Sequence, residues 1–214
     1  MVTNLKGEQV LITAGPTWVP IDNVRVISNI ATGETGILLA NRLAKLGAKV
    51  TLILGPVKAG GINKGVRVIN FQFFNELSSL LSKEIKAKRY DIVVHSAAVA
   101  DYQPVEMSKK KISSSRKKIK LTLRQTPKLI NSLRKALPEA LLAGFKFEPD
   151  LTKDKLICKA RDLLRRARLD LVVANTNQKK HYAAYFVKNN TEYGPYLSKV
   201  DMVNNLITRF TPKT

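Results

Sequence analysis

The chain is poor in the residues that build disulfide and metal sites. Its 214 residues include one cysteine, Cys158, and two histidines, His95 and His181. A lone cysteine excludes an internal disulfide and is typical of a cytoplasmic protein. Neither histidine has a cysteine or second histidine at ligand spacing, which argues against zinc. His95 ends an apolar run and is interpreted as structural.

Long apolar runs and acidic residues are also scarce. No run reaches the roughly 18 apolar residues that span a bilayer, and the polar residues 1–9 lack the apolar core of a signal peptide. We therefore expect no membrane association. Sixteen acidic residues stand against 37 basic ones, a net charge of +21. Such a surface suits nucleic acid or phosphorylated small molecules as ligands. The basic residues are spread over the whole chain, however, which is equally typical of a surface whose lysines are merely solvated.

Apolar periodicity predicts alternating strands and helices. Residues 9–14 and 48–54 are strands around a helix at 33–46, a βαβ unit that implies a parallel sheet. Further strands are expected at 65–70, 90–95, 140–145 and 169–174, and helices at 75–88, 127–136 and 150–168. The tail predicts strands near 183–187 and 194–197 and a helix at 199–210.

These elements predict a single α/β domain over residues 1–214. The expected fold is Rossmann-like with three layers: a mainly parallel sheet, helices on both faces, and a C-terminal strand extension. The core is expected at about 9–175, and the C-terminal strands and helix at about 181–210.

Small and polar residues follow four of the predicted strands: TAGPT, SAAVADY, FKFE and NTN. Ligands of open parallel sheets bind beyond the carboxyl ends of the strands, so we expect a site there. GxGxxG, GxxxxGK[ST] and GxSxG are absent, which disfavours a nicotinamide-dependent reductase, a P-loop enzyme and a serine hydrolase. The segment TGETG at 32–36 has two interpretations. Its glycines either let a phosphate approach the free backbone N–H groups of a helix N-terminus, or the segment is an ordinary helix start without a ligand.

A long break between predicted strands carries a lysine-rich stretch. Residues 109–120 hold seven basic residues and no acid. Residues 107–118 are interpreted either as a solvated loop or as a flexible basic flap that closes over polyphosphate, and their lack of apolar anchors predicts mobility without ligand. The stretch has no aromatic residue for base stacking, which weakens a third interpretation, nucleic-acid binding.

Five segments, in order, resemble phosphopantothenate–cysteine ligases: ITAGPTWVPIDNVRVISNIATGETG, SAAVADY, KKISSS followed by LTLRQTPKLI, GFKFE, and LDLVVANT. The resemblance covers about residues 10–187. It implies a ligase of coenzyme A biosynthesis that activates 4′-phosphopantothenate as an acyl nucleotidylate and passes it to L-cysteine. It also implies a nucleoside triphosphate (CTP favoured, ATP possible), pyrophosphate release, Mg²⁺ and a homodimer. Many bacterial members are fused to a flavin-dependent decarboxylase; none precedes Met1, so a stand-alone form is expected.

The same resemblance assigns roles to individual residues. Asn29 would hold the acyl intermediate, with Arg25 assisting, and Lys111 would meet the triphosphate. The residues that would contact the expected Mg²⁺ are unknown from the sequence. The nucleotide-binding set that it implies comprises Gly15, Ala97, Ala98, Asp101, Lys111, Pro127, Lys128, Leu129, Ile130 and Phe145.

The chain departs from the family at three places. Glu34 stands where a basic or polar residue is frequent, and FKFE replaces FAAE, which leaves CTP and ATP both open. Leu163 and Ala167 replace two lysines of the fused enzymes, with Arg161, Arg165, Arg166 or Arg168 as candidate substitutes. The competing class is a non-catalytic, basic Rossmann-like module that binds nucleic acid. A ligase should bring Asn29, Asp101 and Lys111 to one pocket; a binder should show a continuous basic face remote from them.

Overall fold

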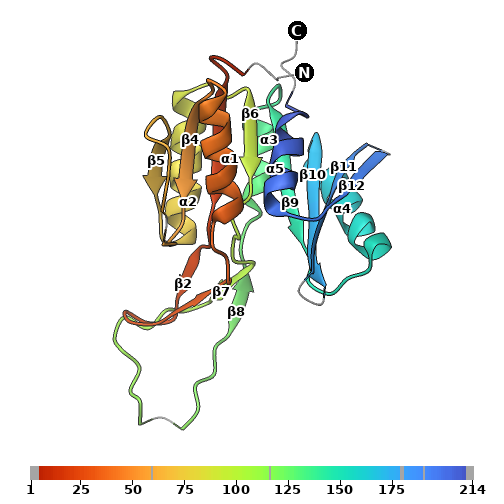
Figure 1. The fold of residues 1–214 in the computed structure, drawn as a ribbon. Helices are drawn as coiled ribbons and strands as arrows, with labels where there is room; N and C mark the ends of the chain where they lie inside the picture. Colours follow the sequence, from red (N-terminus) through yellow and green to blue (C-terminus); the bar gives the residue numbers. More distant parts are fainter. Residues whose placement is uncertain (1–4, 59, 116, 179–180, 190, 211–214) are drawn as a thin grey trace.

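One eight-stranded sheet organises the computed structural model, which describes residues 5–58, 60–115, 117–178, 181–189 and 191–210. Its strand order is β12-β11-β10-β9-β6-β1-β4-β5 (Figure 1). All pairs from β10 to β5 are parallel, whereas β11 and β12 add an antiparallel hairpin at one edge. The strands are β1 (Gln9–Ala14), β4 (Lys49–Leu54), β5 (Arg67–Asn70), β6 (Ile92–His95), β9 (Leu141–Phe147), β10 (Leu171–Gln178), β11 (His181–Lys188) and β12 (Thr191–Tyr196).

Helices cover both faces of this sheet. Alternate residues of β1 point to opposite faces, as the twofold repeat of a strand requires. Val10 and Ile12 belong to the core cluster that includes α1 and α5, and Leu11 belongs to the cluster that includes α2, α3 and α4. The predicted three-layer α/β fold with its C-terminal strand extension is therefore confirmed. The helices are α1 (Glu34–Lys45), α2 (Phe74–Ala87), α3 (Leu129–Ala136), α4 (Lys153–Ala167) and α5 (Lys199–Ile207).

Two short hairpins were not predicted. β2 (Trp18–Pro20) pairs with β3 (Val26–Ser28), and β7 (Tyr102–Pro104) pairs with β8 (Leu123–Gln125). Three residues are too few for alternation to reveal a strand. Residues 18–28 and 102–125, called the arm below, project from the carboxyl edge of the sheet (Figure 1). No helix in the described part of the chain is long and apolar enough to cross a membrane.

Candidate functional site

The loops that follow β1 and β6 are joined at the carboxyl edge of the sheet. Ala98 N–H donates to the carbonyl of Gly15 at 2.9 Å, and Thr17 N–H donates to the carbonyl of Ala98 at 3.3 Å. Gly15 has a φ of +79°, and a Cβ there would lie 3.1 Å from the backbone nitrogen of Gly55. Only glycine meets both demands at low cost. Two motifs far apart in the sequence therefore form one backbone surface.

Asn29 is fastened to this surface by its side chain. Its Nδ2 donates to the carbonyl of Ala98 at 3.0 Å, although the residue is exposed. In the described part of the chain its Oδ1 makes no hydrogen bond. The anchored nitrogen fixes the amide, so the oxygen is a preorganised acceptor beside the loop after β6. The structure thus brings together the predicted residues Gly15, Asn29 and Ala98.

Asp101 joins the same loop to the start of α3. Two buried threonines brace this junction: Thr17 Oγ1 accepts from Ala100 N–H at 2.8 Å, and Thr126 Oγ1 donates to the Ala100 carbonyl at 2.6 Å. Lys128 Nζ pairs with Asp101 at 2.5 Å. Both partners are substantially exposed, which leaves them accessible to a ligand. Neither threonine was predicted from the sequence, where each is only a hydroxyl residue beside a motif.

Arg25 and Lys111 lie on the arm. Arg25 Nη1 pairs with Asp22 at 2.7 Å and donates to the carbonyl of Ile112 at 3.1 Å, while Ile112 N–H donates to Asp22 Oδ2 at 3.0 Å. Ser108 N–H also donates to the carbonyl of Ile21. The first half of the predicted flap is therefore tied to the β2–β3 hairpin, although it lacks apolar anchors; its mobility stays a prediction, and Arg116 lies outside the described residues.

Asp22 is the centre of this attachment. The carboxylate accepts from the backbone N–H of Ile112, and also from the backbone N–H groups of Val24 and Arg25 and the Arg25 guanidinium. These hydrogen bonds lower the pKa of Asp22 to about 2. Lys111 itself is exposed, and no hydrogen bond or ion pair in the described part of the chain joins it to Asn29 or Asp101.

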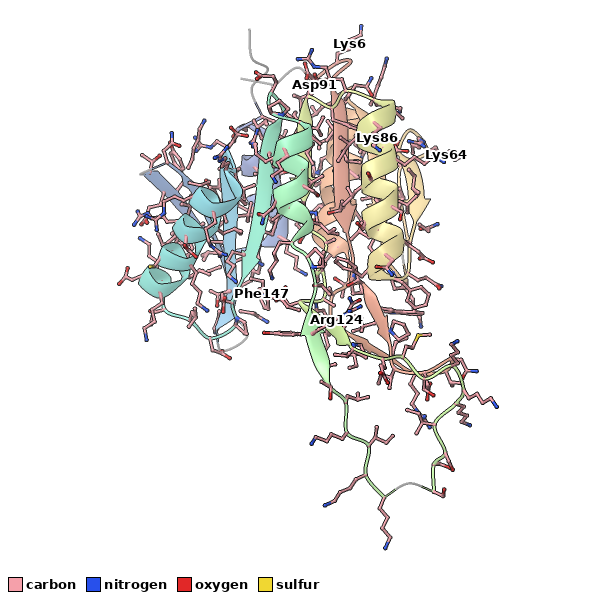
Figure 2. All side chains as sticks on the ribbon, turned by 180° about the vertical axis from the view of Figure 1, so that it is seen from behind. Lys6, Lys64, Lys86, Asp91, Arg124 and Phe147 are labelled. Carbon is pink, nitrogen blue, oxygen red and sulfur yellow. The ribbon has the colours of Figure 1, made fainter. Side chains whose placement is uncertain are left out.

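The nucleotide-binding set divides between two faces of the sheet. Leu129 and Ile130 are buried in the cluster under α2, α3 and α4, whereas Phe145 packs against the cluster under α1 and α5. The side chains of Leu129 and Ile130 are thus core groups, and only the backbone of the α3 start is available to a ligand. Phe147, two residues after Phe145, is 54% exposed at the end of β9 (Figure 2). It is an exposed aromatic surface that was not among the predicted site residues.

The ends of β9 and β10 add polar groups. Lys146 and Lys159 both pair with Glu148 at 2.9 Å. Asn175 Oδ1 and Thr176 Oγ1 are buried without a hydrogen-bond partner. Buried polar atoms are normally paired, so these two mark a position for water or ligand. The contribution of the segment NTN to the site stays a prediction.

α4 presents Lys159, and not an arginine, near the end of β9. Arg161 pairs with Glu192 on β12 at 3.5 Å, and Arg166 pairs with Asp162 at 2.9 Å. Arg165 and Arg168 lie at the carboxyl end of α4, whereas ligands are expected at its amino end. The proposed arginine substitution for the missing lysines therefore has no contact in its favour.

The negative charge of Glu34 is compensated by a lysine from another helix. Lys199, at the start of α5, pairs with it. The glycines flanking Glu34 have structural roles: Gly33 caps α1 with a φ of +69°, and a Cβ on Gly36 would lie 2.3 Å from Ala14 Cβ. TGETG thus fits an ordinary helix start packed closely on β1.

His95 is a core residue. Its Nδ1 lies 2.8 Å from Thr13 Oγ1, and burial lowers its pKa to about 4. The imidazole is therefore neutral near pH 7, and it accepts or donates one hydrogen bond to a buried hydroxyl. The structural interpretation of this histidine agrees with the geometry.

A cavity of about 740 Å³ lies under the arm, between β2, β7 and the start of α2. Its lining includes Trp18, Phe73, Met107 and Arg124, but not Asn29, Asp101 or Lys111. The loop-edge site is instead an open surface, built by hydrogen bonds between loops. Asn29 contacts the loop that ends in Asp101 through Ala98, whereas Lys111 lies on the arm, so the convergence of the three residues on one pocket stays a prediction.

Comparisons with known proteins agree with this geometry. The family model described as "DNA/pantothenate metabolism flavoprotein C-terminal domain" matches residues 5–208. The coenzyme A biosynthesis bifunctional protein CoaBC of Thermococcus kodakarensis is 38% identical over 173 residues, which are 81% of this chain and 42% of that protein. Its Haemophilus influenzae counterpart is 35% identical over 97% of this chain and 53% of its own length.

The fold is also that of a solved structure. The DNA/pantothenate metabolism flavoprotein from Streptococcus pneumoniae is 26% identical, with a TM-score of 0.85 over 95% of this chain and 98% of that one. The chain spans about half or less of the length of the two curated relatives described above.

Proposed function

Because this chain belongs to the family of the DNA/pantothenate metabolism flavoprotein C-terminal domain, we propose that it is a phosphopantothenate–cysteine ligase of coenzyme A biosynthesis. The observation that carries the proposal is the Asn29–Ala98 hydrogen bond, which fixes the Asn29 side-chain amide against the loop that ends in Asp101. Relatives named for coenzyme A biosynthesis support the same assignment. A cytoplasmic location is part of the proposal.

The reaction has two steps. A carboxylate oxygen of 4′-phosphopantothenate attacks the α-phosphorus of a nucleoside triphosphate; a P–O bond forms, the bond to the β-phosphate breaks, and pyrophosphate leaves. The amine of cysteine then attacks the acyl carbon; a C–N bond forms, the C–O bond breaks, and a nucleoside monophosphate leaves with loss of one amine proton to solvent. Both steps need oriented reactants and compensation of phosphate charge.

The residues of the site divide these tasks. Asn29 Nδ2 uses one of its two hydrogens on the Ala98 carbonyl and can donate the second to an oxygen of the acyl group. The small side chains of Ala97 and Ala98 leave room for a nucleotide close to the backbone. Asp101 and Lys128 flank the start of α3, where a ribose hydroxyl and a phosphate would find an acceptor and a donor. Lys111 and Arg25 bring positive charge from the arm. Phe147 offers an aromatic surface to the base.

CTP is the favoured nucleotide and ATP the alternative. Mg²⁺ is expected to neutralise the triphosphate. Among the residues that the structure describes, no three His, Cys, Asp or Glu side chains gather to hold a metal. The site therefore suits a magnesium ion held mainly by phosphate and water oxygens, as is usual for this ion with nucleotides.

A homodimer built through the arm completes the proposal. Large apolar side chains are exposed there, including Val24 at 64% and Tyr102 at 57%. Exposed apolar side chains that gather on one element are a common mark of an interface. The tail strands pair with the sheet, with the ring centroids of Phe186 and Tyr196 4.4 Å apart, and β12 is one edge of that sheet. A second copy at the arm is also a means of bringing Lys111 to a site that it does not reach within one chain.

The decisive experiment combines the protein with 4′-phosphopantothenate, cysteine, Mg²⁺ and either CTP or ATP, and measures pyrophosphate. We expect release with one nucleotide, and ligated product only when cysteine is present. Omitting phosphopantothenate is the control for simple triphosphate hydrolysis. A folded protein that releases no pyrophosphate with either nucleotide would overturn the proposal and favour the non-catalytic alternative.

A further inference from the structure

A cation-lined hollow lies between the carboxyl ends of α3 and α4, remote from the arm. It has a volume of about 540 Å³ and is lined by Arg134, Lys135, Arg166 and Arg168 together with the amide of Asn131. No acidic residue is among its lining residues. The two helices pack side by side on one face of the sheet, α3 green and α4 cyan in Figure 2.

One of these cations already has a structural task. Arg134 Nη2 pairs with Asp170 at 2.5 Å, its Nε donates to the carbonyl of Arg168 at 2.6 Å, and its Nη1 donates to the carbonyls of Pro138 and Ala140 at 2.8 and 3.1 Å. The Arg168 carbonyl lies at the negative end of α4, and the carbonyls of Pro138 and Ala140 lie in the loop between α3 and β9. Arg134 therefore compensates carbonyl groups that would otherwise repel an anion.

The other three cationic side chains are not fully used in contacts that hold the fold together. Lys135 and Arg168 are exposed and make no ion pair in the described part of the chain. Arg166 uses only its Nε on Asp162, at 2.9 Å, so its terminal nitrogens stay available. Arg168 adopts a left-handed conformation, with a φ of +52°, while Arg134 holds its carbonyl. Its backbone is thus fixed at the rim of the hollow.

We propose that this hollow is a second anion site, which binds the phosphate group of a small phosphorylated ligand. Arginine forks and a lysine converging on one hollow suit phosphate, since guanidinium groups make paired hydrogen bonds to its oxygens. Asn131 adds a neutral donor. Of the four lining cations, Arg134 and Arg166 pair with Asp170 and Asp162, whereas Lys135 and Arg168 make no ion pair in the described part of the chain, which leaves a local excess of positive charge.

The site lies on the helix that leads to the proposed nucleotide site. α3 begins beside the Lys128–Asp101 pair, and its last turn carries Arg134, which pairs with Asp170. A ligand in the hollow contacts the last turn of a helix only eight residues long, so it acts on the element whose first turn meets the nucleotide. This regulatory role rests on the proposed function; binding in the hollow does not.

Binding is tested directly by NMR. Inorganic phosphate is titrated at constant ionic strength while the backbone amide signals of Asn131, Lys135 and Arg168 are followed. We expect saturable shifts of these signals, and at least tenfold weaker binding in the double variant Lys135→Gln/Arg168→Asn. Asparagine is chosen because it tolerates the left-handed conformation. The matched control is Arg42→Gln/Lys45→Gln, which removes the same charge from the last turn of α1.

Unaltered amide signals at the hollow would overturn the proposed site. Equal weakening of phosphate binding in both double variants would also overturn it, because a general loss of surface charge produces that result. The regulatory role is tested by nucleotide affinity with and without phosphate. Phosphate can also compete with the nucleotide at the nucleotide site, but it does so equally in the parent and in the double variant of the hollow. A difference between the two proteins in how phosphate changes nucleotide affinity therefore reports binding in the hollow. An equal effect in both would overturn the regulatory role and leave the ligase activity unaffected.

Discussion

The side-chain nitrogen of Asn29 donates to the backbone carbonyl of Ala98, 69 residues further along the chain. This one contact joins the segment that follows β3 to the loop that follows β6. It fixes which end of the amide faces the site, and it does so without burying the residue.

Changing Asn29 to aspartate should therefore disable catalysis. Asn29→Asp loses the donor and places a carboxylate against a carbonyl and near phosphate. We expect turnover to fall by about 10²–10³, the usual cost of removing a transition-state donor. Pyrophosphate release is the measurement, and Asn204→Asp, on an exposed face of α5, is the matched control. Unimpaired turnover would rule out the role of Asn29.

Lys111→Ala should weaken triphosphate binding. A desolvated charge-assisted contact contributes roughly 1.5–3 kcal/mol, which corresponds to a loss of affinity of about 10- to 150-fold. Calorimetric titration with the nucleotide measures it. Lys109→Ala and Lys110→Ala are the internal controls, because we expect both side chains to stay in solvent. Equal affinity in parent and Lys111→Ala would count against the role of this lysine.

The attachment of residues 108–112 to the arm hairpin should depend on the charge of Asp22. Its pKa is lowered to about 2, so the stabilisation is complete above the ordinary value of 3.8 and is lost as the pH falls through about 2. Asp22→Asn should accelerate hydrogen exchange of the Ile112 amide at neutral pH. Exchange as slow as in the parent would mean that other contacts hold the segment.

His95 should make the protein sensitive to mild acid. Burial lowers its pKa from 6.5 to about 4, so the unfolded chain binds the extra proton first. Stability is complete above pH 6.5 and falls between there and about pH 4, by of order 3 kcal/mol if the burial persists. Denaturant unfolding across this range measures it. His95→Gln should flatten the dependence, and an equally steep fall in that variant would assign the effect to other groups.

Association through the arm should tighten with salt. Subunits of net charge +21 repel, and salt screens that repulsion. Sedimentation at two salt concentrations with nucleotide present should show more dimer at the higher one. Ile27→Asp, on the exposed face of β3, should shift the protein to monomer, while Val200→Asp on α5 should not. A monomer mass for the parent at both concentrations would exclude the dimer at micromolar protein.

The sheet could be predicted because its strands are apolar on both faces and its helices carry clear periodicity. Residues 140–145 and 169–174 were predicted too short, since β9 and β10 continue to Phe147 and Gln178 through polar residues. Tertiary pairing, and not apolar pattern, sets those ends: β10 is held by β11 along its whole polar extension. The carboxyl-edge location of the site followed from topology alone.

The pairing of side chains within the site could not be predicted. Nothing in the sequence indicates that Asp22 would hold Ile112, that Lys199 would offset Glu34, or that Lys159 would meet Glu148. Each contact joins segments whose separation is set by the whole fold. The resemblance supplied candidate residues, but it placed Leu129 and Ile130 in a pocket where their side chains are core groups.

The loop between β7 and β8 on the arm is a place where the chain can tolerate insertions. Pro104 pairs with Leu123, so residues 105–122 form a loop whose two ends are already closed by β7 and β8. For such a loop the entropy of closure grows only with the logarithm of length, and doubling it costs roughly 0.6 kcal/mol. Insertions at the tip, beyond the Ile112 attachment, should therefore cost little stability, which makes this loop the natural place for length differences among homologous chains and for an inserted spectroscopic label.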